Sequence, residues 1–389
     1  MNSRKVSALV GVSLSALLLV GCGKFNNEFN STNNNQTTTQ SKKSKGFQTT
    51  GQAGKDQYQG VIENGRYRVS KSRGVGVQQD ADNMMNLKSF DTGMTDISKK
   101  FFSPKDYIFQ EGQYLTTSTV EDWLGRKSKN DSEGLNPPDN GSNDPKKRAP
   151  MYIQQIGEQD YMKNNNGKLS LAGMTIGIGM NQKDYYQKEK YGPTFTQSIP
   201  KDKMEEEGKI AAKKVLERVR KIDGVGNSTP IVIAMFEQAP NDSLVGGTFY
   251  AYTVSNSGTN MDSWKKLDIK NYTFPATSTN SVPNANDEHS FENFRDKVQN
   301  FFPNLAGVTA QAQYDGDTLE GMDITITTQF YSETEITSFT QYVAQAAQSY
   351  LPNHIPIDIQ INGSDGKTQA FLARNESDAK FYTHVFNGY

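Results

Sequence analysis

The chain has 389 residues, with 42 basic and 43 acidic side chains, a formal net charge of −1, 34% apolar residues and a single cysteine, Cys22. This balance, without a basic patch, argues against a nucleic-acid partner, and one cysteine excludes an internal disulfide and a thiolate metal site. The apolar residues beyond the N-terminal region suffice for two modest cores.

The N-terminus has the pattern of a lipoprotein signal peptide. Arg4 and Lys5 form a short basic region, and residues 6–21 form an apolar run too short to span about 30 Å of hydrocarbon as a permanent helix. The run leads into Cys22, whose thiol can accept a diacylglyceryl group; the alternative is a buried core cysteine, which the polar residues after it disfavour. We therefore predict signal peptide 1–21, cut by signal peptidase II and followed by lipoprotein acylation enzymes. Cys22 then anchors the protein at the extracytoplasmic face of the membrane, with no cofactor besides this lipid.

Residues 22–57 are rich in Asn, Thr, Gln, Ser, Lys and Gly, with few large apolar side chains. Such a segment buries too little to offset the entropy cost of ordering, so we predict a flexible tether. Beyond it we expect a first lobe over residues 58–270 and a second over residues 271–389. Residues 126–150 of the first lobe are almost devoid of apolar side chains and predict a long exposed loop.

Two helices are predicted early in the first lobe. A helix over residues 89–102 would carry four apolar side chains on one face: Phe90, Met94, Ile97 and Phe101. Ser118 and Glu121 have the spacing of a capping box for a short helix that holds Trp123.

A repeated pattern gives the fold class. After Gly173, alternate residues are apolar through Met180, and the same alternation follows Gly321 from Met322. Each copy precedes an amphipathic helix, the second capped by Ser332 and Glu335, and then two further strands. The order predicts an α+β protein of two lobes, each a mainly antiparallel sheet with helices on one face. An internal duplication and a chance recurrence of a common unit both account for it.

The segment after the first repeated strand is a candidate ligand-binding site. Gly177 and Gly179 leave one face of that strand bare, which suits either close packing by a helix or approach by a ligand. Aromatic and charged side chains follow, and such mixtures suit sugar or peptide recognition as well as plain packing. The candidates are Tyr185, Tyr186, Lys188 and Tyr191.

Catalytic signatures are sparse in this sequence. The histidines stand far apart and no nucleophile or phosphate-loop motif occurs, so neither a catalytic residue nor a metal ligand is assigned. Glu111, Glu158 and Asp160 lie beside aromatic residues and are further candidate ligand-binding residues. Paired carboxylates among them leave open a surface hydrolase acting on cell-wall sugar or peptide.

Four strings in order, over residues 109–115, 158–161, 173–181 and 185–192, together with the Cys22 motif, resemble the CamS family of Gram-positive lipoproteins, described as sex pheromone precursors. The resemblance implies that a peptide from the end of the signal peptide acts as a pheromone. The two predicted lobes, the aromatic segment from Tyr185 to Tyr191 and the missing catalytic motifs favour a folded body that is a non-enzymatic binding or accessory module, and we expect a cell-wall or peptide ligand. The corresponding peptide residues are Ser15, Ala16, Leu17, Leu18, Leu19, Val20 and Gly21.

Overall fold

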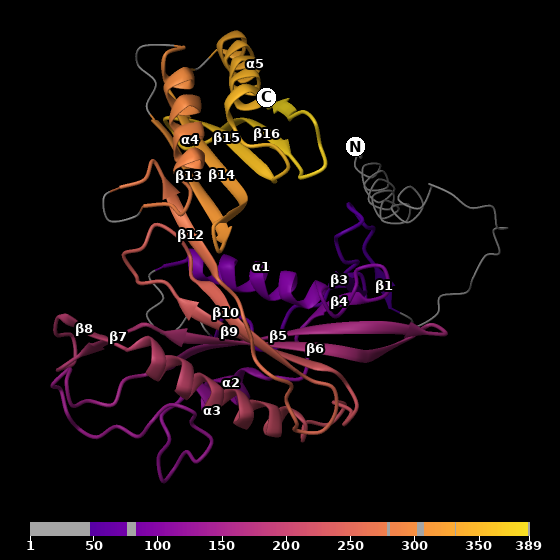
Figure 1. The fold of residues 1–389 in the computed structure, drawn as a ribbon. Helices are drawn as coiled ribbons and strands as arrows, with labels where there is room; N and C mark the ends of the chain where they lie inside the picture. The colour runs from indigo at the N-terminus through magenta and orange to yellow at the C-terminus, as the bar shows by residue number, and fades with distance from the viewer. Residues whose placement is uncertain (1–46, 76–82, 278–280, 302–306, 331, 388–389) are drawn as a thin grey trace, which may run out of the picture.

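The computed structural model describes residues 47–75, 83–277, 281–301, 307–330 and 332–387 (Figure 1). They form two α+β lobes, each built on a six-stranded sheet, as the sequence predicts. The chain passes from the first sheet to the second between Lys266 and Ile269. Cys22 and residues 15–21 lie outside the described residues. Among the described helices, none is long and apolar enough to cross a membrane.

The lobe 1 sheet has the strand order β11-β10-β9-β6-β5-β4, with β6 and β9 parallel and every other pair antiparallel. Its strands are β4 (Ile108–Glu111), β5 (Ile153–Asn165), β6 (Lys168–Asn181), β9 (Ile231–Gln238), β10 (Thr248–Ser255) and β11 (Lys265–Lys266). Its helices are α1 (Met85–Lys99), α2 (Thr117–Leu124) and α3 (Lys201–Val219).

Helices cover both faces of the lobe 1 sheet. The sequence predicted helices on one face only, so lobe 1 has one more layer than expected. On one face, α2 and α3 pack on a core that includes Ile176 and Ile178. On the other, α1 places Phe90 and Met94 over the sheet. A Cβ on Gly177 would lie 2.5 Å from the Phe90 ring, so the bare strand face serves close packing of a helix.

The lobe 2 sheet has the order β12-β13-β14-β15-β16-β17, with only β14 and β15 parallel. Its strands are β12 (Ile269–Phe274), β13 (Gly307–Asp315), β14 (Thr318–Thr328), β15 (Ile357–Gly363), β16 (Thr368–Arg374) and β17 (Tyr382–Val385). Helices α4 (Ala285–Gln299) and α5 (Glu333–Tyr350) pack on one face, and the predicted capping box of Ser332 and Glu335 is present on α5. Burial alternates along β14 and β15, so the other face is polar and uncovered.

The two sheets repeat each other in detail. Met174 is paired with Ile231 where the parallel pair of lobe 1 begins, as Met322 is with Ile357 in lobe 2. The amide of Met174 donates to the carbonyl of Pro230 at 3.0 Å, and that of Met322 to Pro356 at 3.1 Å. The hairpins before these strands and the antiparallel pairs after them also shift register at matching places. Shared bulges favour the internal duplication over a chance recurrence.

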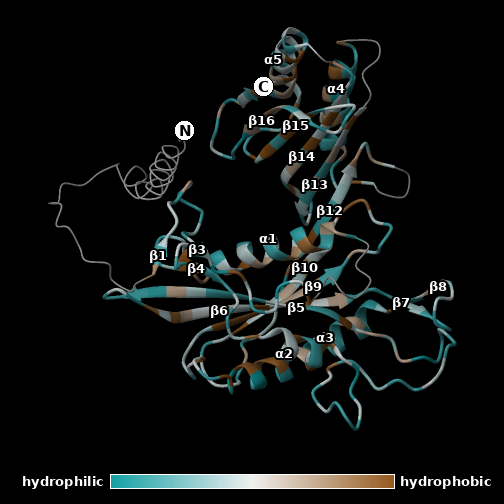
Figure 2. Cartoon of the chain, turned by 180° about the vertical axis from the view of Figure 1, so that it is seen from behind, coloured by the Kyte–Doolittle hydropathy of each residue, from teal (hydrophilic) through white to brown (hydrophobic). Residues whose placement is uncertain are grey.

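Smaller elements flank lobe 1. A three-stranded sheet holds β1 (Gln48–Thr49), β2 (Val61–Glu63) and β3 (Arg66–Tyr67), and a hairpin holds β7 (Lys183–Gln187) and β8 (Thr194–Ser198). Because β1 pairs with β2, the last ten residues of the predicted tether belong to the folded body. Hydrophilic residues dominate the loops around the hairpin (Figure 2).

Two local predictions need correction. The capping box of Ser118 and Glu121 is wrong: the N-cap of α2 lies two residues earlier, at Thr116, whose hydroxyl accepts from the amide of Thr119 at 3.2 Å. The predicted loop 126–150 is exposed along most of its length, yet Asn136 is buried and donates to the carbonyls of Leu124 and Ile153. This buried side chain is one of the contacts that hold the loop to the body.

Candidate functional site

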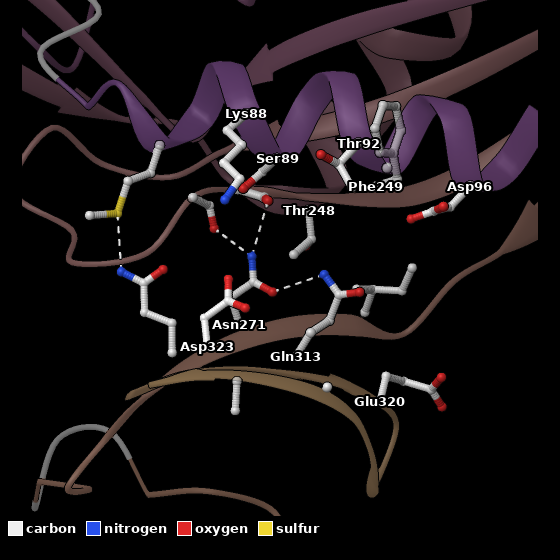
Figure 3. Close-up of a pocket in the computed structure, with 18 of the residues that line it drawn as sticks. Lys88, Ser89, Thr92, Asp96, Thr248, Phe249, Asn271, Gln313, Glu320 and Asp323 are labelled. Atoms are coloured by element: carbon white, nitrogen blue, oxygen red, sulfur yellow. Dashed lines mark hydrogen bonds between the residues drawn. The ribbon is translucent and has the colours of Figure 1, made fainter. Parts of the chain in front are cut away.

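A cleft of about 520 Å³ lies where lobe 2 meets α1 of lobe 1 (Figure 3). Helix α1 contributes one wall, and the uncovered polar face of the lobe 2 sheet contributes the other. The side chains that carry polar groups into it include Lys88, Ser89, Thr92, Asp96, Asn271, Gln313, Glu320, Asp323 and Asp358. Both lobes thus supply potential ligand contacts.

Side-chain amides join the lobes at the cleft. Asn271 donates to the carbonyl of Gly246 at 3.0 Å, and Gln311 donates to that of Leu244 at 2.8 Å. Gln313 in turn donates to the Asn271 side-chain oxygen at 3.1 Å. Asn271 and Gln311 thus link the lobe 2 sheet to the loop before β10, and Gln313 orients Asn271. The position of the lobe 2 wall of the cleft therefore depends on a few polar contacts.

The lining of the cleft is acidic. Asp323 and Asp358 are directly opposite each other on β14 and β15, an arrangement of like charges that is unfavourable unless a cation is nearby. Burial raises the pKa of Asp358, the charge of Asp323 raises it further, and Lys88 lowers it. Asp96 and Glu320 add two more carboxylates, and the lining holds only one further basic residue. The cleft therefore suits a ligand that carries a positive charge.

The predicted carboxylates Glu158 and Asp160 lie together, but inside lobe 1 and not in the interlobe cleft. The Glu158 carboxylate accepts from the amides of Gln113 at 3.1 Å, Tyr114 at 2.9 Å and Leu115 at 2.7 Å. Asp160 accepts from the same Gln113 amide at 3.0 Å. Both carboxyls are buried, and burial raises both pKa values, that of Asp160 further because of the neighbouring Glu158.

These bonds explain what the pair does. The segment that leads into α2 has main-chain amides with no strand partner, and the carboxylates satisfy them. Glu111 has a similar role, since it accepts from the Ser70 amide at 2.6 Å. Glu111 and Glu158 also border a hollow of about 500 Å³ beside α1. Oxygens bound to main-chain amides are not presented to a substrate, so the geometry does not favour a hydrolase.

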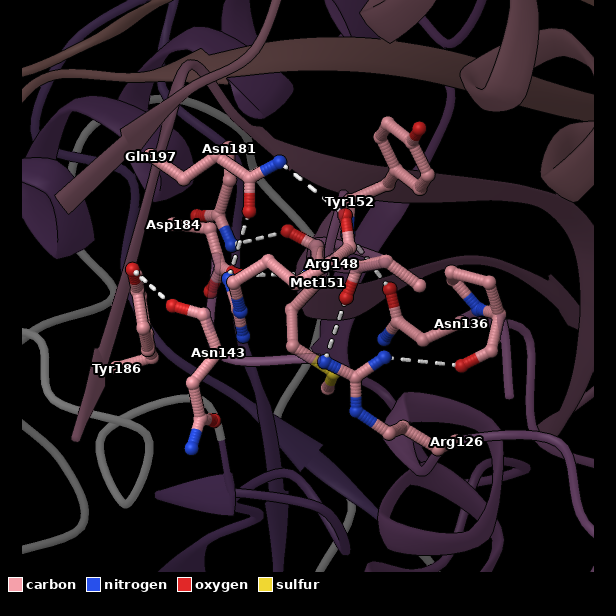
Figure 4. Close-up of polar contacts among 12 residues, drawn as sticks. Arg126, Asn136, Asn143, Arg148, Met151, Tyr152, Asn181, Asp184, Tyr186 and Gln197 are labelled. Atoms are coloured by element: carbon pink, nitrogen blue, oxygen red, sulfur yellow. Dashed lines mark hydrogen bonds and ion pairs between the residues drawn. The ribbon is translucent and has the colours of Figure 1, made fainter. Parts of the chain in front are cut away.

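The predicted aromatic candidates have separate surroundings. Tyr186 is buried; the Arg148 guanidinium lies 3.9 Å from its ring centroid, and its hydroxyl donates to the Asn143 carbonyl at 3.1 Å. Arg148 forms an ion pair with the buried Asp184 (Figure 4). The buried ring thus helps to hold the long loop against the β7–β8 hairpin.

The other three candidates point elsewhere. The Tyr185 hydroxyl accepts from the Asn241 amide at 3.0 Å, and the Lys188 ammonium lies 4.2 Å from the Phe195 ring centroid. Tyr191 is 87% exposed near the hairpin tip. None of the four lines the interlobe cleft, and ligand binding by them remains a prediction.

Sequence reasoning missed the cleft because its walls come from elements far apart in the chain. One signal was present, since the residues between the buried positions of β14 and β15 are polar, among them Asp323, Thr325, Asp358 and Gln360. That alternation marks a sheet face left open.

Within the described residues, no group of three or more His, Cys, Asp or Glu side chains could hold a metal ion.

A family model described as CamS sex pheromone cAM373 precursor matches residues 67–380. The crystal structure of a sex pheromone precursor from Lactobacillus salivarius subsp. salivarius UCC118 is 65% identical, covers 88% of this chain and 100% of its own, and superposes with a TM-score of 0.86. The C-terminal domain of the sex pheromone staph-cAM373 precursor from Staphylococcus aureus is 26% identical over 80% of this chain and 100% of its own, with a TM-score of 0.69. Curated proteins gave no match. All four strings singled out in the sequence lie inside the matched region.

Proposed function

Since the chain belongs to the CamS family of sex pheromone precursors, we propose that it is a lipid-anchored extracytoplasmic protein with two products. The first is a peptide from its signal sequence. The second is a folded body that binds a ligand between its lobes. The cleft, lined by polar side chains from both lobes, is the observation that carries the proposal for the body.

The anchor rests on Cys22, the only thiol of the chain, placed directly after an apolar run. Replacing Cys22→Ser removes the sulfur needed for the thioether, so we expect loss of lipid label and either uncleaved precursor or shed protein. Ser31→Ala, in the same polar segment, is the control and should keep label and membrane retention. Membrane-retained, lipid-labelled Cys22→Ser protein would contradict the anchor.

The peptide proposal concerns residues 15–21, which end at the predicted cleavage site. Mass spectrometry of culture medium should detect the corresponding heptapeptide from the unmodified strain and not from the Cys22→Ser strain. Synthetic peptide should then raise plasmid transfer in a responsive recipient. A released peptide without this effect would leave the precursor chemistry intact and remove the signalling role.

For the body, the acidic lining favours a wall peptide with a free amino group over a neutral sugar. Calorimetric titration with a lysine-containing wall peptide should give saturable binding. Asp323→Asn and Asp358→Asn, combined, should weaken it about tenfold or more through loss of the paired negative charge. Glu376→Gln, at an exposed position outside the cleft, is the matched control. Equal binding by an acetylated peptide would argue against recognition of the amine.

A further inference from the structure

A pocket of about 320 Å³ lies in lobe 1, away from the interlobe cleft, between α3, strand β10 and the edge strand β11. Its apolar lining consists of Met235, Tyr250, Ala251, Trp264 and Leu267. Its charged lining consists of Lys201, Glu205, Lys209, Lys266 and Asp268. The volume falls at the small end of the range of about 300 to 1,000 Å³ found for small-molecule sites.

A β-bulge directs Tyr250 into this pocket. The pairing of β10 with β9 shifts between Phe249 and Ala251, so Tyr250 is the extra residue of the bulge, and bulges re-aim side chains. The helix comes close here because Gly208 has no side chain: a Cβ would lie 2.9 Å from the Tyr250 hydroxyl.

The Tyr250 hydroxyl is buried and has no hydrogen-bond partner among the described residues. Burial raises its pKa above the usual range, and the charges of Glu205 and Glu237 raise it further, so the group stays protonated and is a donor. A buried donor without an acceptor is costly, and natural sites supply one. An acceptor atom of a ligand would fill this role, and the flexible Met235 side chain can yield to admit it.

The charges around the pocket leave a positive excess. Asp268 is held by Lys270 at 2.8 Å, and Lys201 lies 3.8 Å from Glu237. Lys209 and Lys266 have no ion pair within the described part of the chain, and only Glu205 opposes them in the lining. Lys209 follows Gly208 directly, and Lys266 is paired with Ala251, so both adjoin the residues around the hydroxyl.

We propose that this pocket binds a small organic anion with an apolar body, of the class of a medium-chain carboxylate. The carboxylate accepts from the Tyr250 hydroxyl and is attracted by Lys209 and Lys266. The chain lies along Met235, Trp264 and Leu267. This site is separate from the interlobe cleft and does not depend on its ligand.

The chain contains a reporter for the test. It has two tryptophans, of which Trp264 lines the pocket and Trp123 lies in the α2 helix. The test uses the body from residue 47 onward, where the described fold begins, and a crystallised relative that is 65% identical covers 88% of this chain. With Trp123→Phe, all indole fluorescence reports Trp264. We expect decanoate to change the Trp264 fluorescence saturably. Its affinity should be at least about tenfold higher than that of decanol, and decylammonium should bind more weakly than decanol.

Substitutions can test the contribution of the lysine charges to binding separately from that of the Tyr250 hydroxyl. The Lys209→Gln and Lys266→Gln double variant should weaken decanoate about tenfold and leave decanol unchanged. Lys213→Gln, exposed on the same helix, is the matched control. Glu205→Gln should strengthen decanoate binding, because it removes the opposing charge.

Tyr250→Phe should weaken decanoate and at the same time raise the melting temperature of the empty protein, since it removes the unpaired donor. Equal affinity for the three amphiphiles, a change that does not saturate, or lysine variants that bind as the unmodified body does would each overturn the proposal. If Tyr250→Phe proves unstable, the lysine and Glu205 variants alone decide the question.

Discussion

The two lobes have the same strand order and share two bulges, yet one sheet is covered on both faces and the other on one. The register places Val232, Ala234 and Phe236 of lobe 1 where lobe 2 has Asp358, Gln360 and Asn362. The first set faces α1; Asp358 of the second lines the interlobe cleft. The comparison teaches that the repeated unit determines the topology, while a few side chains per strand determine the number of layers.

The largest expected effect is on the added layer. Phe90→Ala should lower the free energy of unfolding of lobe 1 by about 3 to 5 kcal/mol, because the ring is fully buried between α1 and the sheet. Urea titration followed by tryptophan fluorescence reports it, since both tryptophans are in lobe 1. Thr325→Ala on the open face of lobe 2, which has no tryptophan and is followed by circular dichroism, should change the free energy of unfolding by less than about 0.5 kcal/mol. Similar losses of unfolding free energy for Phe90→Ala and Thr325→Ala would show that the covered face of lobe 1 and the open face of lobe 2 do not differ as described.

A residue exchange tests the same point at one equivalent position. Gly177 of β6 corresponds to Thr325 of β14 by register. Gly177→Thr should cost about 1 to 3 kcal/mol or more, because its Cβ would lie 2.7 Å from the Met94 sulfur as well as against the Phe90 ring. Thr325→Gly should cost about 1 kcal/mol or less. If lobe 1 accepts threonine without loss, α1 does not pack as described.

The carboxylates offer a third contrast, since Glu158 and Asp160 stand where lobe 2 has Ala310 and Ala312. Glu158→Gln should cost about 1 to 3 kcal/mol at neutral pH, because an amide NH₂ would face main-chain donors. Asp160→Asn should cost little, since its oxygen still accepts from Gln113. Urea titration at neutral pH measures both costs.

The pH dependence of the pair has a definite sign. Both pKa values are raised in the folded state, so the folded protein holds protons that the unfolded chain has released. The free energy of unfolding should therefore fall as pH rises from the ordinary carboxyl pKa of about 4 towards the raised value. Urea titrations across this range should show the fall, and Asp160→Asn should flatten it. An unchanged slope in that variant would mean that other groups carry it.

The smallest expected effect is at the junction of the lobes. Asn271→Ala removes the hydrogen bond to Gly246 and should cost about 0.5 to 1.5 kcal/mol. Hydrogen exchange should show the loss at β12 and at the loop before β10, with the lobe cores unchanged. Faster exchange throughout lobe 2 would show that the junction stabilises the whole lobe.

The secondary structure could be predicted from the sequence most reliably where apolar residues recur at regular spacing. The central strands β6 and β14 and helices α3 and α5 follow from apolar spacing alone. Strand β5 did not, because its run of Gln, Gly, Glu and Asp has low strand propensity and its pairing with β6 determines its structure. Phe90, Met94 and Ile97 marked the buried side of α1 without saying which sheet face it covers, because that is a tertiary contact. The cleft likewise needs both lobes in place.

The way the lobes are joined has a mechanical consequence. The apolar clusters lie wholly within one lobe or the other, and the chain crosses between the sheets at Leu267 and Asp268. A polar junction of this kind resembles the interfaces across which domains swing. We therefore expect the two lobes to move relative to each other about a hinge at this crossing. The side-chain amides of Asn271 and Gln311 should stabilise the orientation of the lobes seen here. A ligand that bridges α1 and the lobe 2 sheet would then reduce the radius of gyration in solution scattering.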